Sequence, residues 1–395
     1  MRDYRFQTPD GLSDILPEDC AAKREMENRL RKLFGLYGYQ EIETPGLEFL
    51  DVFSGADFVM PEHMYKMTDE SGRLLALRYD GTIPAARVAA TLLREEPLPL
   101  RLSYVENMYR FKESGGGRQK EFSQGGVELL GVSSPEADAE VIALAIRSAL
   151  DVGVEDLQIS LGQVEFFLGL MEEWQISAEN AQAFSRLIDQ KDTVALGNLA
   201  DRCSLGEHEK ELLLLLPARF GTYDILDDFE NRIRNKKAEK ALRNIRDILD
   251  ILDDYGYLQY VSVDFGMLRS LDYYTGMIFK GFTYEIGFPV FSGGRYDHVV
   301  SAFGKDIPSV GFSIGINLCM TALQRQKKAL IAPAIDVVLG YASPAVRAKA
   351  LKKAENLRGE GLRTLLDCEG KTKNELENFA EKAGIHQCIY IEEST

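Results

Sequence analysis

The sequence predicts an α+β fold: an antiparallel sheet core over residues 1–325, a helical insertion at about 164–257, and a small C-terminal α/β domain over 333–395. Three observations predict it. Strand-like runs follow one another through the core without long helical crossovers, as hairpin-linked antiparallel strands do. The insertion is helical in pattern and rich in charge, as in "NRIRNKKAEKALRNIRDILDILDDYG". The tail alternates strand with helix, which is typical of a parallel sheet.

The first hundred residues contain two helical patterns and two strands. A helical pattern covers residues 17–36, and Pro17 suits its first turn. The run "GYQEIETP" is a short strand that stops at Pro45, and "RLLALRYDGT" is a strand that ends in a turn at Gly81. Residues 82–96 have the amphipathic pattern of a helix.

A hairpin is predicted next, because "LRLSYVENMYRF" and "KEFSQGGVELLG" flank a glycine-rich loop. A helix over about 135–152 and the strand "DLQISLG" lead into the insertion. Strands return behind it as "VSVDFGM", "GMIFKGFTYEIG" and "FPVFSGG". In the tail, "IDVVLGY", "RTLLDC" and "QCIYIEE" are the strands of a βαβαβ unit.

Charge and composition exclude several classes of function. The net charge is −16, from 46 basic against 62 acidic residues, so the surface repels phosphate backbones. This argues against nucleic acid as the main partner, although a local basic patch remains an alternative. Five scattered cysteines without a C-x-x-C pair suit a reducing cytoplasm, and four scattered histidines predict no zinc site. The polar N-terminus has no signal-peptide pattern, and no apolar run is long enough for a membrane span.

The strand "KEFSQGGVELLG" carries candidate ligand-binding residues. Gln124 and Glu128 lie four apart, so the two-residue period of a strand puts both on one face. Gly125 and Gly126 between them are expected to leave room for a ligand to approach the backbone. The alternative is a solvent-facing strand with a glycine bulge.

Neighbouring segments add charged groups. Arg110 ends the preceding strand, and its planar fork of donors suits a carboxylate or phosphate, with surface ion pairs as the alternative. Asp80 and Thr82 lie two apart at a strand end, as an ammonium-binding pair or as a turn that Thr82 caps.

The segments "RSLDYYTG" and "FSGGRYD" supply the remaining candidates. The first contains Arg269, Tyr273 and Tyr274, and adjacent tyrosines of a strand point to opposite faces. The second contains Tyr296, in a pattern that also fits a simple turn. Carboxylates, arginines and tyrosines converging on one sheet would suit a zwitterion. We find no Ser-His-Asp or Cys-His set and no Walker-type or dinucleotide loop, so no cofactor is expected.

Together these segments resemble class II histidyl-tRNA synthetases over about residues 8–325. "GYQEIETP" resembles the dimer-forming first motif, "MYRFKESGGGRQKEFSQGGVELLG" the second and "SVGFSIGINL" the third, while "RSLDYYTG" and "SGGRYD" are similar to the two histidine-specific signatures. The tail is similar to a shortened anticodon-binding domain. The resemblance implies a class II aminoacyl-tRNA synthetase-like core that binds histidine.

By that resemblance, eight residues contact histidine. Three hold its ammonium, two read its imidazole, two arginines lie near its carboxylate, and a tyrosine lies beside them. In that order they are Asp80, Thr82 and Gln124; Glu128 and Tyr274; Arg110 and Arg269; and Tyr273.

Two motifs depart from the synthetase pattern on the side that would face ATP. Arg-x-Glu of the second motif is Arg110-Phe111-Lys112 here, and Gly-x-Glu-Arg of the third ends in Asn317 and Leu318. In the synthetases that final arginine clamps the γ-phosphate of ATP, and a leucine cannot form such a charge-assisted bond.

This mixture resembles the ATP phosphoribosyltransferase regulatory subunits, a paralogous family of histidine biosynthesis; "LPLRLSYVENMYRFKE" and "FGKDIPSVGF" are especially similar. The resemblance implies a cytoplasmic, non-catalytic chain, with no cofactor and no membrane association. It would be a homodimer within a hetero-oligomer, pairing with a short-form catalytic subunit and sensing L-histidine. The α/β tail is a partial departure, because that group usually lacks a full anticodon domain. The alternative is a catalytically active histidyl-tRNA synthetase.

Overall fold

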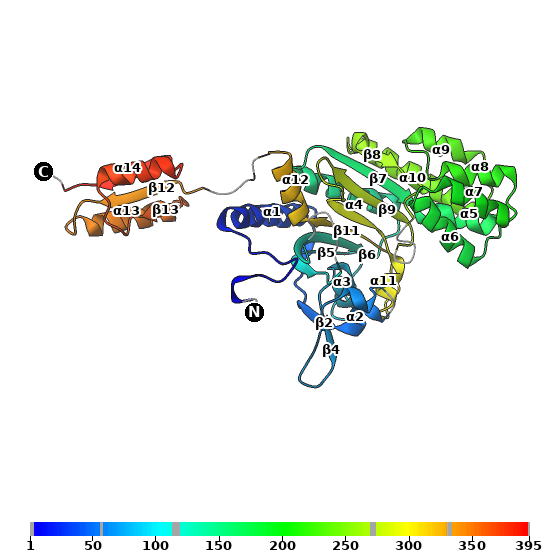
Figure 1. Ribbon diagram of the computed structural model, residues 1–395, viewed down its shortest axis with the longest axis horizontal. Helices are drawn as coiled ribbons and strands as arrows, with labels where there is room; N and C mark the ends of the chain where they lie inside the picture. The colour runs from blue at the N-terminus through cyan, green and yellow to red at the C-terminus, as the bar shows by residue number, and fades with distance from the viewer. Residues whose placement is uncertain are drawn as a thin grey trace. The chain divides into compact units, whose positions relative to one another are not determined.

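A mixed eight-stranded sheet forms the centre of the computed structural model (Figure 1), which describes residues 4–55, 58–112, 119–268, 274–328, 330 and 334–393. The chain divides into two units, Met1–Leu330 and Ile331–Thr395. In spatial order the strands of the large sheet are β1 (Gln40–Glu41), β5 (Leu100–Tyr109), β6 (Glu121–Leu130), β11 (Ser309–Gly315), β10 (Phe291–Arg295), β9 (Met277–Thr283), β7 (Leu157–Gln163) and β8 (Val261–Val263).

The pairing confirms the predicted antiparallel core and adds a parallel strand at each edge. All pairs from β5 through β7 are antiparallel, whereas β1 pairs with β5 and β8 pairs with β7 in parallel. The chain separates β7 from β8 by the whole helical insertion, so this pair is a crossover and not a hairpin. A smaller antiparallel sheet has the order β2 (Leu47–Phe49), β4 (Leu74–Leu77) and β3 (Lys66–Thr68).

Helices cover the large sheet. On one side, α1 (Pro17–Leu36), α4 (Pro135–Asp151) and α12 (Ile316–Arg325) pack against its strands. A second group of helices consists of α2 (Leu50–Ser54), α3 (Thr82–Ala90) and α11 (Asp297–Ser301), in which α3 contacts both of the others. Short 3-10 helices occur at Tyr4–Phe6, Pro61–His63 and Leu258–Tyr260. The helix predicted over 82–96 ends at Ala90, because residues 91–96 form turns ahead of the strand β5.

The insertion is helical, as predicted, and its helices gather beside one end of the sheet (green in Figure 1). They are α5 (Val164–Glu173), α6 (Ala178–Asp189), α7 (Thr193–Arg202), α8 (Glu207–Leu215), α9 (Tyr223–Glu230) and α10 (Lys236–Asp254). The long helix α10 packs against both α5 and α4, so it joins the insertion to the core. Gln163 and Asn244 tie the two parts by a hydrogen bond of 2.9 Å.

The second unit is the predicted βαβαβ arrangement. Its parallel sheet has the order β13 (Thr364–Leu366), β12 (Val337–Tyr341) and β14 (Gln387–Ile391), with α13 (Arg347–Gly359) and α14 (Lys373–Lys382) between successive strands. Thr372 and Glu375 form a capping box at the start of α14, which satisfies two backbone donors there. Val338 and Leu376 belong to one buried cluster between the sheet and α14.

Membrane-spanning helices and metal-binding clusters are both absent from the described residues. None of the described helices is both long and apolar enough to cross a membrane. Nor do histidine, cysteine, aspartate and glutamate side chains gather into a group that could hold a metal ion anywhere in the described part of the chain.

Candidate ligand-binding site

Two adjoining cavities open over β6, β10 and β11, the smaller at the start of α3 and the larger at the start of α12. The smaller has a volume of about 150 Å³ and the larger about 300 Å³, at or below the lower end of the range for drug-sized ligands. Four residues line both: Arg110, Gln124, Ser292 and Ser313. The smaller cavity is further lined by Asp80, Thr82, Tyr274, Gly293, Tyr296, Gly311 and Phe312.

Glu128 lies beside the smaller cavity and is 1% exposed. Strand β11 pairs Gly311 directly opposite it, and a Cβ there would overlap the Glu128 carboxyl. The hydroxyl of Tyr104 donates to Glu128 Oε1 at 3.2 Å, and the hydroxyl of Tyr296 donates to Oε2. Burial is the main cause that raises the pKa of Glu128 to about 8, although these hydrogen bonds lower it. The carboxyl is therefore easily neutralised near physiological pH.

Asp80 faces the same cavity from the turn before α3. Its Oδ1 accepts a hydrogen bond of 3.1 Å from the backbone N–H of Ile83, so Asp80 caps the first turn of the helix. Burial raises the pKa of Asp80 to about 6, while that backbone bond and the charge of Arg110 lower it. The expected turn is therefore present, but Asp80 and not Thr82 caps it.

Arg110 is held between two aromatic rings in the wall that the cavities share. Its guanidinium carbon lies 4.9 Å from the ring centroid of Tyr79 and 4.9 Å from that of Phe122. Such stacking fixes the plane of the guanidinium, whose charge and fork of donors suit a carboxylate. Nearby, the buried Gln124 Oε1 has no hydrogen-bond partner among the described residues, so it is an available acceptor for a ligand N–H.

Tyr274 completes the smaller cavity. Its ring lies against Gly294, where a Cβ would come within 2.8 Å of the ring carbon Cδ1. Burial and the nearby Glu128 and Asp80 raise the pKa of Tyr274 above its usual value, so the phenol stays protonated.

The structure thus places five of the eight predicted residues around one small cavity, with a sixth, Glu128, reached through Tyr296. Arg269, Tyr273 and most of the glycine-rich loop lie outside the described residues. That the set binds histidine stays a prediction.

One expectation about the glycines is wrong. Gly126 does not leave room for a ligand, because the ring of Tyr104 fills the space beside it. Gly125 faces the other side of the sheet and packs against Leu30 and Phe34.

Three residues at or beside the smaller cavity were not predicted from the sequence: Tyr104, Ser292 and Ser313. A signal for Tyr104 exists, because the hairpin register pairs it with Gly126 and an aromatic opposite a glycine fits the space that the glycine leaves. The two serines have no sequence signal of their own.

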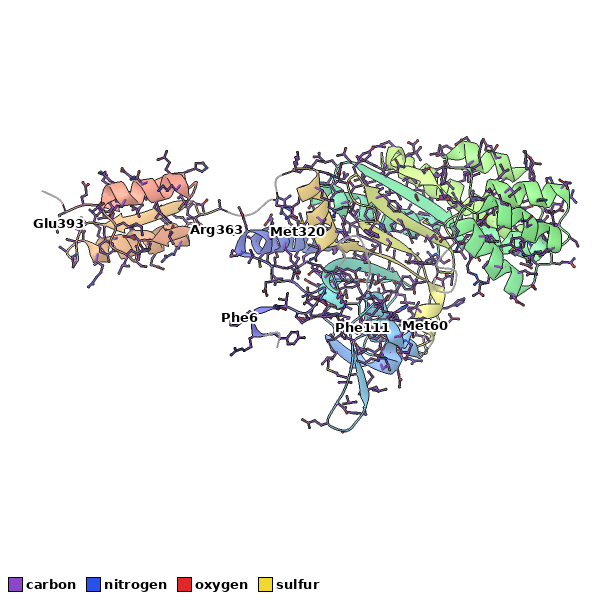
Figure 2. All side chains as sticks on the ribbon, in the orientation of Figure 1. Phe6, Met60, Phe111, Met320, Arg363 and Glu393 are labelled. Atoms are coloured by element: carbon purple, nitrogen blue, oxygen red, sulfur yellow. The ribbon has the colours of Figure 1, made fainter. Side chains whose placement is uncertain are left out.

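The larger cavity contains the departure in the third synthetase motif. Asn317 and Leu318 line it, together with Met320 of α12, which Figure 2 labels. Asn317 donates to Gln119 Oε1 at 2.9 Å and accepts from the backbone N–H of Ser123 at 2.8 Å. Among the described lining residues Arg110 is the sole cation, against Asp14 and Asp19, so this cavity is poorly suited to a triphosphate.

Comparisons with known proteins place the chain in a family. The family described as "Histidyl-tRNA synthetase" matches residues 11–318. The ATP phosphoribosyltransferase regulatory subunit of Acetivibrio thermocellus is 48% identical over 98% of this chain and 92% of that protein. The protein of the same name from Ruminiclostridium cellulolyticum is 43% identical over 100% of this chain and 94% of that protein.

Solved structures of similar fold come from the same two groups of proteins. A Bacillus halodurans protein described as an ATP phosphoribosyltransferase regulatory subunit/histidyl-tRNA synthetase superposes with a TM-score of 0.88 at 28% identity, over 100% of both chains. The histidyl-tRNA synthetase of Nostoc sp. PCC 7120 has a TM-score of 0.86 at 21% identity, over 98% of this chain and 92% of that one, which shows the fold alone. Fold and cavities together define a protein of the histidyl-tRNA synthetase type. Within that type, the chain belongs to the family of ATP phosphoribosyltransferase regulatory subunits.

Proposed function

We propose that this chain is the non-catalytic regulatory subunit of a cytoplasmic ATP phosphoribosyltransferase, a glycosyltransferase complex. Its partner is a short-form catalytic subunit that joins phosphoribosyl to ATP in the first step of histidine biosynthesis. The chain described here is required for that activity and gives the complex its feedback inhibition by histidine. The similarity to regulatory subunits over nearly the whole chain supports this proposal.

The observation that carries the histidine proposal is the pair of carboxyl groups at a small cavity: Asp80 lines it together with Arg110, and the buried Glu128 lies beside it. An ammonium group fits Asp80 and Gln124 Oε1, a carboxylate fits Arg110, and a ring N–H fits the region of Glu128. Histidine has all three groups; tryptophan has them too, but its indole is larger than an imidazole and the cavity is small.

Asn317 and Leu318 favour regulation over catalysis. They occupy the positions at which the synthetases carry Glu and Arg, and neither can neutralise phosphate charge. The active-synthetase alternative requires ATP to bind beside them.

A groove lined by charges of both signs supports the homodimer proposal. A cavity of about 670 Å³ lies between α1 and the β1 edge of the sheet, lined by charges of both signs. Arg78 and Glu106 form a buried ion pair of 2.7 Å in it, and Arg31 binds Glu41 at 2.8 Å. A two-fold interface sets the same patch against itself, and a patch with charges of both signs allows opposite charges to meet across it.

Co-purification tests the proposal most directly. The chain and a short-form catalytic subunit should elute as one complex, and histidine should inhibit phosphoribosyl transfer only when this chain is present. Two separate peaks, or equal inhibition of the catalytic subunit alone, would contradict it.

A further inference from the structure

We propose that Tyr104 is a positioning residue that fixes the Glu128 carboxyl to accept a ring N–H, and thereby makes the pocket select an imidazole side chain. The inference rests on the proposed histidine site and concerns a residue that lines neither cavity. Tyr104 lies on β5 and acts through Glu128 on β6.

The ring of Tyr104 is held in a slot made by two glycines. Register pairs it with Gly126 across the hairpin, and Gly81 approaches it from the turn before α3. A Cβ at either glycine would overlap the ring. Tyr104 is only 1% exposed, so its hydroxyl can reach little except the interior polar groups.

That hydroxyl meets the carboxyl that must recognise the ligand ring. It donates to Glu128 Oε1 at 3.2 Å, while Tyr296 donates to Oε2 from the other side. Two donors on separate oxygens fix both the rotation and the position of the carboxyl. Since Tyr104 is anchored by its ring and not by a loop, it can hold this geometry before a ligand arrives.

Charge in the pocket depends on the same bond. The groups that face Glu128 are Tyr104 of β5, Thr82 of α3, Tyr296, Tyr274 and Asp80. The Tyr104 bond lowers the pKa of Glu128 and so favours the ionised form that accepts an N–H. Loss of the hydroxyl therefore moves Glu128 ionisation, and with it tight histidine binding, to higher pH.

The test is calorimetric histidine titration of the full chain with Tyr104→Phe, from about pH 6 to pH 9, the range around the Glu128 pKa. We expect about tenfold weaker binding near neutral pH, because Glu128 loses a bond that favours its ionised form and such a bond is worth about that factor, and an affinity profile shifted to higher pH. Tyr39→Phe is the matched control. Tyr39 is also buried and also donates to a glutamate, Glu140, at 3.2 Å, but it lies outside the pocket.

Gly126→Ala is a second variant that displaces the ring and should weaken binding in the same sense. A merely structural role for Tyr104 predicts a lower Tm with unchanged affinity and pH profile in both variants, and that result overturns the inference. Wild-type protein that fails to bind histidine refutes the proposed histidine site itself. Wild-type binding with unaltered variants refutes only the role of Tyr104.

Discussion

At the scale of single residues, Asp80 and Glu128 determine the charge that the smaller cavity can accept. Burial raises the pKa of both carboxyls, to about 6 and about 8 respectively. A cationic ligand group stabilises the ionised forms, so ligand binding and proton release are linked.

Above about pH 8, where Glu128 is ionised, Glu128→Gln should weaken histidine binding by about 1.5–3 kcal/mol, because a hydrogen bond to a charged group is replaced by one to a neutral amide. Isothermal calorimetry would measure this as a loss of tenfold or more. Glu121→Gln is the control, since Glu121 lies on the same strand but contacts Asn107 and Tyr109 outside the cavity. Equal affinity of both variants would place the ring reader elsewhere.

The pH dependence of stability follows from the sign of the Glu128 shift. Its folded-state pKa of about 8 lies above the usual value of 4.5, so the folded protein binds the proton more tightly than the unfolded chain. This contribution to the free energy of unfolding is complete below about pH 4.5 and is lost as pH rises to about 8. Urea unfolding of the ligand-free protein should show stability falling over that range, with a flatter profile for Glu128→Gln. A rise over the range in both proteins contradicts this assignment.

The two-residue period of a strand predicted that Gln124 and Glu128 lie on one face. Asp80 was a candidate because it lies at the turn that follows a strand. The sequence did not indicate Tyr104, whose contact with Glu128 depends on the register of two strands across a loop. Nor could it show that Phe122 and Tyr79 enclose Arg110, because that arrangement joins three segments.

At the scale of elements, the start of α12 carries Asn317 and Leu318, on which the prediction of no synthetase activity depends. Histidine-dependent exchange of pyrophosphate into ATP should stay at background, because Asn317 and Leu318 give the larger cavity no charge against the γ-phosphate. An active histidyl-tRNA synthetase assayed in parallel is the positive control. Robust exchange would revive the synthetase interpretation.

Long periodic elements were predictable and short ones were not. The helix α1 begins at Pro17 and ends at Leu36, as its pattern indicates, whereas residues 91–96 are helical in pattern but form turns. The sequence could not predict that β1 pairs in parallel with β5, or that β8 pairs in parallel with β7. Each of these edge strands is only two or three residues long, so its position depends on packing against the rest of the sheet.

At the scale of the whole molecule, the charged groove beside α1 is the candidate two-fold interface. Arg31→Glu should shift the protein from dimer to monomer in sedimentation experiments, because it reverses a charge in the groove that would face the partner copy. Arg29→Glu is a matched control on the same helix, with side-chain exposure of 35% against 33% for Arg31 and no position in the groove. A dimer that survives Arg31→Glu, or dissociates equally with Arg29→Glu, places the interface elsewhere.

The slot around Tyr104 also limits how this pocket can mutate. A larger residue at Gly81 or Gly126 overlaps the ring, and a smaller residue at 104 leaves a void between two glycines. In a library of double mutants, side chains at 81 and 126 that are lethal to folding beside Tyr104 should become tolerable beside alanine or serine at 104. Histidine specificity, however, should not return with the fold. Positions 81, 104 and 126 would then be constrained to evolve together, because the residue tolerated at each one depends on the residues at the other two.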